Sequence, residues 1–331
     1  MSTAPLLRPG PVVCVGETMA ALAPDPAAPL DTAELLRLDV AGAESNVAMY
    51  LADHGVPARW VSALGDDPFG RRVRERIAAS GVDVSGVRTD PARPTGLLVK
   101  NPGTEATSVH YYRTGSAASA LGPSVLDEPA LRDAALVHLT GITPALSPSC
   151  RALVERALRP GRPYAVSFDV NHRPALWGDE PAAGILLALA ARADLVLVGL
   201  DEAQALWGKT LGDGAGPGAV RALLPQPRVL VVKDGARAAT AYIGPDTYTV
   251  RAPKVRVVEP VGAGDAFAGG FLAGLLRYDD PVQALRLGHL TAASALRVLA
   301  DHGPLPPPDR TRELLAADEA TWNALSVQGR V

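Results

Sequence analysis

A single acid stands at a Gly-rich junction in front of an apolar helix, in the stretch VEPVGAGDAFAGGFLAGLL at residues 258–276. A helix that begins after such a turn exposes unpaired backbone N–H groups at the positive end of its dipole, and phosphate is the usual anion bound there. The amides of Gly262, Ala263 and Gly264 would form this anion site, because glycine lets the backbone approach without a Cβ in the way. Asp265 beside them would accept the proton of a hydroxyl group that attacks the bound phosphate.

The spacing alone leaves a second interpretation open, in which Asp265 only complements the helix dipole and takes part in no reaction. Two other nucleotide motifs are excluded. The pattern G-x-G-x-x-G would need glycine at Phe267, and a P-loop ending at LWGKT would need glycine at Ala203. A phosphate site in this chain therefore has a different form from both motifs.

The composition narrows the class of protein. The chain has 331 residues, 47% of them hydrophobic, and a net charge of −3, which argues against a nucleic-acid or anionic membrane surface. Two cysteines build no disulfide framework, and the six histidines form no zinc motif. The N-terminus does not read as a signal peptide, and no apolar run is long enough for a membrane helix. We therefore expect a cytoplasmic protein that acts on small molecules.

Short apolar runs alternate with longer segments rich in Ala, Leu and Arg, which predicts an α/β fold with a central, mostly parallel sheet and helices on both faces. Residues 21–40 and 93–119 interrupt this alternation of predicted strands and helices. The second segment contains TGLLVKNPGTEATSVHYYR, which alternates like a strand, a turn and a strand. We expect one α/β domain over residues 1–331 with a small β lid formed by these two segments. The sequence leaves open whether the protein forms a homo-oligomer in which exposed edges of two lid sheets pair.

The junction EPVGAGDAFAGGF resembles the D-T-x-G-A-G-D signature of the ribokinase-like (PfkB) carbohydrate kinases, with Glu259 and Pro260 at its first two positions. AGAESNVAMYLADHG (41–55) is similar to the sugar-binding signature of this family, and VVKDGARAA (231–239) to its nucleotide-binding strand and turn. The resemblance implies a ribokinase-like fold, with ATP and Mg²⁺ as cofactors and Asp265 as the catalytic base. It leaves dependence on a monovalent cation open.

Three further features resemble the 2-keto-3-deoxygluconate kinases of this family: YYRTGSAASAL, DVNHRPALW and LADHG (299–303). The resemblance implies these substrate contacts: Gly42, Ala43, Glu44, Ser45, Asn46, Tyr111, Arg113, Arg173, Asp265 and Asp301. It implies these ATP contacts: Asn171, Arg173, Lys233, Asp234, Gly235, Ala236, Arg237, Ala238, Gly262, Ala263 and Gly264. Glu202 would act on Mg²⁺ indirectly, in an N-x-x-E element whose Asn is Gly199 here. Leu98 stands where many of these kinases carry an aromatic residue.

The expected reaction is transfer of the γ-phosphoryl group of ATP to a hydroxyl of a sugar acid. The carboxylate of such a sugar favours a bidentate guanidinium, which Arg113 or Arg173 would supply. Tyr111 and Tyr112 alternate on a strand, so we expect one to pack and only the other to face the site. A kinase of a neutral sugar or nucleoside is the first alternative. A sugar-sensing protein without catalysis is the second, and the intact GAGD argues against it.

Overall fold

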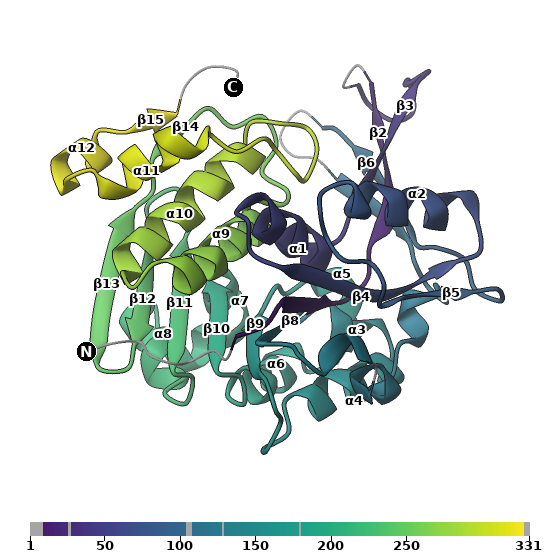
Figure 1. The fold of residues 1–331 in the computed structure, drawn as a ribbon, viewed down its shortest axis with the longest axis horizontal. Helices are drawn as coiled ribbons and strands as arrows, with labels where there is room; N and C mark the ends of the chain where they lie inside the picture. Colours follow the sequence, from purple (N-terminus) through teal and green to yellow (C-terminus); the bar gives the residue numbers. More distant parts are fainter. Residues whose placement is uncertain (1–8, 26–27, 104–107, 128, 179, 328–331) are drawn as a thin grey trace.

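A nine-stranded sheet forms the centre of the structure, a computed structural model that describes residues 9–25, 28–103, 108–127, 129–178 and 180–327 (Figure 1). The strands follow the order β13-β12-β11-β10-β9-β8-β1-β4-β5. Their bounds are β1 (Val12–Val15), β4 (Ala58–Gly65), β5 (Val87–Asp90), β8 (Leu136–Thr140), β9 (Ala165–Asp169), β10 (Leu195–Gly199), β11 (Val229–Asp234), β12 (Ala238–Ile243) and β13 (Asp246–Arg251). From β11 to β5 the strands pair in parallel, and β12 and β13 extend the sheet antiparallel. The predicted mostly parallel α/β sheet is confirmed.

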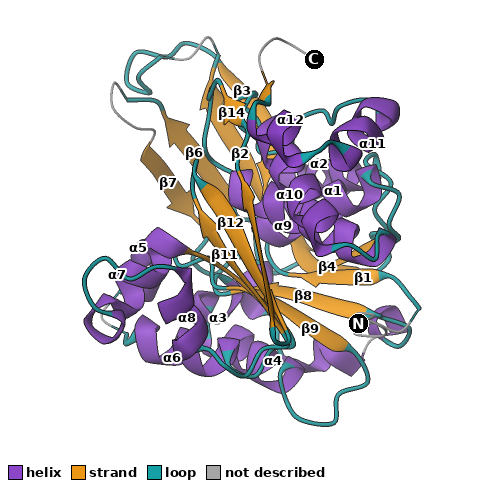
Figure 2. Cartoon of the chain, turned by 90° about the vertical axis from the view of Figure 1, so that its left-hand side faces the viewer, coloured by secondary structure: helices purple, strands orange, loops and turns teal. Residues whose placement is uncertain are grey.

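Helices cover both faces of this sheet (Figure 2). One face carries α1 (Ala43–Asp53), α2 (Pro68–Ala78), α9 (Ala263–Arg277), α10 (Pro281–Ala295), α11 (Pro308–Ala316) and α12 (Glu319–Asn323). The other carries α3 (Thr143–Leu146), α4 (Pro148–Ala157), α5 (Pro174–Trp177), α6 (Ala182–Ala190), α7 (Leu200–Leu211) and α8 (Pro217–Leu223), with 3-10 turns at Ala118–Ala120, Pro123–Asp127 and Pro129–Leu131. Successive strand residues alternate between the two cores: Leu195 and Leu197 enter the first, Val196 and Val198 the second.

A second sheet of four strands stands apart from the main one, in the order β3-β2-β6-β7 (Figure 1). It contains β2 (Met19–Pro24), β3 (Leu36–Ala41), β6 (Leu97–Asn101) and β7 (Ser108–Tyr112), and we call it the lid sheet. The two segments singled out in the sequence supply these strands, although β2 begins two residues before residue 21. β6 and β7 pair antiparallel as the alternation predicted, and residues 104–107 between them lie outside the described residues. A short parallel pair, β14 (Lys254–Val255) and β15 (Ser326–Val327), lies near the C-terminal helices.

The glycines of α9 let this helix lie close against its two neighbours. A Cβ at Gly269 would stand 2.8 Å from the Cβ of Tyr50 in α1, and one at Gly274 would stand 2.5 Å from the Cα of Ala284 in α10. A side chain at either position would push the helices apart. This packing fixes the first turn of α9 at the carboxyl ends of the parallel strands, where open α/β sheets bind ligands. No helix in the described part of the chain is long and apolar enough to cross a membrane.

Candidate active site

Three adjoining cavities meet at the first turn of α9. The lid cavity, about 260 Å³, lies under the lid sheet and is lined by Leu98 and Tyr111 among others. The central cavity, about 420 Å³, lies at the ends of β9, β10 and β11. The outer cavity, about 480 Å³, lies between β12 and α10. Gly262 and Asp265 line both the lid and the central cavity, and Gly264 lines both the central and the outer cavity. The Gly-rich junction therefore stands where all three spaces meet.

Asp265 is held by two amide side chains and is only 7% exposed. Its Oδ2 accepts from Nδ2 of Asn46 at 3.0 Å, and its Oδ1 accepts from Nδ2 of Asn171 at 3.1 Å. Asn171 has a φ of 37°, a left-handed conformation that asparagine adopts more easily than most residues. Burial raises the pKa of Asp265, although the hydrogen bond from Asn46 and the charge of Arg173 act in the opposite direction. An oriented carboxylate with a raised pKa is suited to accept a proton.

Free backbone donors lie beside this carboxylate. α9 begins after Gly262, whose φ of 84° is a left-handed conformation that favours glycine. Within the described residues, the amides of Gly262, Gly264 and Asp265 have no acceptor, whereas that of Ala263 donates to the carbonyl of Pro260 at 3.4 Å. The free amides at this turn thus include that of Asp265, which the sequence analysis did not predict, whereas the amide of Ala263, which it did predict, already has an acceptor.

Three charged side chains meet in the central cavity. Nζ of Lys233 donates to Oδ2 of Asp169 at 2.8 Å, and Oδ1 of Asp169 is buried without a hydrogen-bond partner. Glu202 accepts from the amides of His172 and Gly199, the latter at 3.1 Å. Burial raises the pKa of Glu202 to about 7, and the negative charge of Asp169 adds to the shift. Burial alone would lower the pKa of Lys233, but Asp169 and Glu202 outweigh this effect and raise it.

Two buried ion pairs lie in the wall of the lid cavity, and each includes a basic residue that lies in the lid sheet or directly after it. Nε of Arg113, which follows β7, donates to Oε2 of Glu17 at 2.6 Å, so this guanidinium already has a carboxylate partner. Nζ of Lys100 in β6 lies 2.8 Å from Oδ1 of Asp301. Arg173, by contrast, is exposed, lines both the lid and the central cavity, and forms no ion pair within the described residues. Of the two arginines predicted to receive a sugar carboxylate, Arg173 is the one whose guanidinium is available.

Most of the remaining residues predicted to contact the substrate line one cavity. The lid cavity is lined by Gly42, Ala43, Glu44, Asn46, Tyr111 and Asp301. Glu44 uses its carboxylate to accept from Thr140 and Thr143, both at 2.8 Å, and burial raises its pKa to about 7. Ser45 is fully buried, accepts from Thr18 at 2.7 Å and does not line the cavity. Tyr112 is 65% exposed, so the expectation that one of the two tyrosines packs is wrong.

The predicted nucleotide residues divide into two groups. Lys233, Gly235, Ala236 and Ala238 line the outer cavity together with Ala263 and Gly264. Asp234 and Arg237 do not line it and pair with each other instead, with Nε to Oδ2 at 2.7 Å. The rest of the outer cavity is largely apolar, with Val257, Phe267, Ala292 and Leu296 in its wall. Such a surface suits a flat heteroaromatic ring.

The sequence reasoning missed Asp169, Glu17 and Lys100. Asp169 is the first residue of the motif DVNHRPALW, and its position at the end of a buried strand was a usable signal. Glu17 and Lys100 carried no such signal, because their partners Arg113 and Asp301 lie 96 and 201 residues away along the chain.

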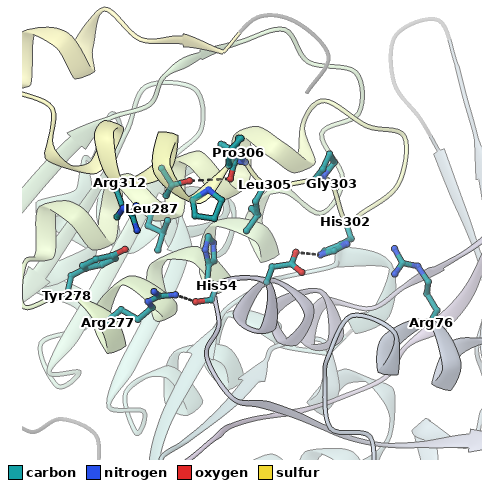
Figure 3. A pocket seen from close by; sticks show the side chains of 15 residues that line it. His54, Arg76, Arg277, Tyr278, Leu287, His302, Gly303, Leu305, Pro306 and Arg312 are labelled. Atoms are coloured by element: carbon teal, nitrogen blue, oxygen red, sulfur yellow. Dashed lines mark hydrogen bonds and ion pairs between the residues drawn. The ribbon is translucent and has the colours of Figure 1, made fainter.

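A larger cavity, about 740 Å³, lies outside this arrangement (Figure 3). His54, Arg277, His302 and Pro304 are in its wall, and Nε2 of His302 lies 2.8 Å from Oδ2 of Asp53. None of the predicted site residues lines it. Although it is larger than the three cavities at α9, it is therefore not the candidate reaction site.

Comparisons with known proteins agree with this geometry. The family model described as pfkB family carbohydrate kinase matches residues 11–306. The chain is 37% identical over 311 residues to a 2-dehydro-3-deoxygluconokinase of Thermoproteus tenax, covering 92% of this chain and 94% of that protein. It is 34% identical over 314 residues to the 2-dehydro-3-deoxygluconokinase of Bacillus subtilis (strain 168), covering 92% and 94%. The crystal structure of a PfkB protein from Polaromonas sp. JS666 superposes with a TM-score of 0.80 at 35% identity, covering 93% and 100%. The chain belongs to the pfkB family of carbohydrate kinases.

Proposed function

We propose that this protein transfers the γ-phosphoryl group of ATP to a hydroxyl of a sugar acid of the 2-keto-3-deoxygluconate class. The observation that carries the proposal is the position of Asp265, which lines both the lid cavity and the central cavity beside free backbone amides. A hydroxyl bound in the lid cavity and a phosphate bound in the central cavity would both reach this carboxylate. The names of the relatives from Thermoproteus tenax and Bacillus subtilis support the choice of a sugar acid.

In the proposed reaction, Asp265 accepts the proton of the sugar hydroxyl while the hydroxyl oxygen attacks the γ-phosphorus and ADP leaves. The amides of Gly264 and Asp265 donate to the phosphoryl oxygens, whose charge is spread in the transition state. Asn46 and Asn171 hold the carboxylate in place from two sides. Most of the rate enhancement in such a reaction comes from positioning and charge neutralisation.

The central cavity also fits a Mg²⁺ ion that is shared with the nucleotide. Among the described residues, no group of three or more His, Cys, Asp and Glu could hold a metal. Magnesium in phosphoryl-transfer sites needs only one or two carboxylates, because phosphates and waters complete its shell. Asp169 and Glu202 supply carboxylates here, and Oδ1 of Asp169 has no other partner. The ion would neutralise charge on the β- and γ-phosphates.

Arg173 supplies the preference for an acid sugar. Its guanidinium lies at the boundary of the lid and central cavities without an ion-pair partner in the described chain, so it can pair with a sugar carboxylate. The lid sheet closes over the sugar and excludes water, which suppresses hydrolysis of ATP. A kinase of a neutral sugar remains the alternative, because Arg113 is already neutralised by Glu17.

The test is ADP release from the purified protein with ATP, Mg²⁺ and a panel of sugars. The panel contains 2-keto-3-deoxygluconate, its galactonate epimer, fructose, ribose and adenosine. We expect kcat/KM to be highest for the two keto-deoxy acids and ADP release without sugar to stay at background. Preference for fructose, ribose or adenosine would contradict the sugar-acid assignment, and absence of ADP release with every member would contradict the kinase itself.

A further inference from the structure

Lys100 extends from the lid sheet to an acid on the other side of the lid cavity. Its Nζ lies 2.8 Å from Oδ1 of Asp301 and 3.4 Å from the carbonyl of Leu299, and both charged side chains are only 7% exposed. Removing one partner of a buried ion pair is costly, because the other charge remains buried without compensation. The pair is thus a strong constraint on both side chains.

The backbone next to Asp301 is held by the main body of the protein. The next residue, His302, pairs with Asp53 at 2.8 Å, and the amide of Gly303 donates to Oη of Tyr50 at 2.8 Å. A Cβ at Gly262 would lie 2.8 Å from the carbonyl oxygen of Asp301, so this segment also touches the anion site. The segment of Asp301 thus belongs to the main body, whereas Lys100 belongs to β6 of the lid sheet.

The two oxygens of Asp301 have different surroundings. Oδ1 accepts from Lys100, whereas Oδ2 faces no hydrogen-bond donor in the described part of the chain. Asp301 and Asp265 line the same cavity, so their like charges repel each other. Lys100 offsets this repulsion, because it places a positive charge 2.8 Å from Oδ1 of Asp301.

From this geometry we infer that Lys100 is a positioning residue for the sugar: it holds Oδ1 of Asp301 so that Oδ2 accepts a sugar hydroxyl. The inference rests on the proposed function, because it takes the lid cavity as the sugar site. Since Lys100 comes from β6 and Asp301 from the main body, the complete sugar contact exists only when the lid is closed. Lys100 thereby links recognition of the sugar to lid closure.

The test is a double-mutant cycle with Lys100→Met, Asp301→Asn and the double variant, measured as KM for the sugar, KM for ATP, kcat and Tm. Lys100→Met should raise the sugar KM at least about tenfold, as expected for loss of a hydrogen bond to a charged group. The ATP KM should change little, because Lys100 does not line the outer cavity. Lys100→Arg should recover much of the loss. Lys209→Met is the matched control, since it removes one exposed lysine charge outside all these cavities.

If Lys100 acts through Asp301, the two substitutions are not additive, and the double variant lies within about threefold of the worse single variant. Additive effects would show a direct contact of Lys100 with the sugar and would overturn the inference, as would a loss of Tm with an unchanged sugar KM. The cycle uses whichever panel sugar the wild type prefers, and calorimetric binding of each panel sugar replaces KM if turnover is absent. The sugar panel therefore tests the sugar-acid assignment, and the double-mutant cycle tests the role of Lys100 independently of it.

Discussion

Asn46 donates from Nδ2 to Oδ2 of Asp265 across 3.0 Å, although the two residues lie 219 positions apart along the chain. This contact joins the first turn of α1 to the first turn of α9 at the proposed base. The other polar atom of the amide, Oδ1 of Asn46, is buried and has no hydrogen-bond partner. A buried acceptor of this kind needs a donor, and a sugar hydroxyl in the lid cavity would supply one. Asn46 would thus orient both the base and the substrate.

Asn46→Ala should shift the acid limb of the pH profile of kcat/KM to higher pH. The hydrogen bond from Asn46 lowers the pKa of Asp265, so its removal raises a pKa that burial has already raised above 3.8. The base works only when deprotonated, hence activity is lost at a higher pH in the variant. Glu202→Gln is the control. Burial raises the pKa of Glu202 to about 7, so its titration would give a separate acid limb, and this variant removes that limb. An acid limb that stays in place in Asn46→Ala would contradict the assignment.

Two glycines of the anion site should respond in opposite ways to alanine. Gly262 has a φ of 84°, and its Cβ would lie 2.8 Å from the carbonyl of Asp301. Gly262→Ala should therefore lower both Tm and kcat, with a strain of about 1–2 kcal/mol from the left-handed backbone alone.

Gly264→Ala should fold at least as stably as the wild type. Its Cβ would meet nothing closer than Nζ of Lys233 at 3.7 Å, and alanine has the higher helix propensity. The added methyl group would crowd the phosphates, so the KM for ATP should rise. Thermal melts and ATP titrations of the two variants check this contrast, and equal Tm losses would speak against it.

Arg173 and Arg113 should separate into a substrate-binding residue and a structural one. Arg173→Met should raise the KM for an acid sugar by about tenfold or more, since a charge-assisted hydrogen bond is lost, and should leave Tm unchanged. Arg113→Met leaves Glu17, only 3% exposed, without its cation and should cost about 3–5 kcal/mol of stability.

The control for this separation is Glu17→Gln combined with Arg113→Met, which should recover much of the stability by removing the stranded charge. Steady-state kinetics give the sugar KM and denaturant titrations give the stability. Both are measured on the wild type, Arg173→Met, Arg113→Met and the double variant. A large rise in sugar KM for Arg113→Met with unchanged stability would reverse the assignment.

The local sequence was sufficient to predict the fold and to single out the junction at which the three cavities meet. The parallel sheet follows from apolar strands that alternate with helices, and the junction follows from the glycines and the acid between Gly262 and Asp265. The partners of charged residues did not follow, because Arg113 meets Glu17 and Lys100 meets Asp301 only after the lid sheet and the main sheet are assembled. Two arginines at equally suitable positions were therefore indistinguishable in the sequence, and their surroundings in the fold separate them.

The base assignment for Asp265 is tested most directly by Asp265→Asn, compared with the wild type in turnover of the preferred sugar and in calorimetric binding of ATP. The amide keeps the shape of the side chain and cannot accept the hydroxyl proton. We expect kcat to fall by about three orders of magnitude or more, from loss of the base and of positioning together, while the Kd for ATP stays within about threefold. Turnover close to that of the wild type, with ATP bound normally, would contradict the account.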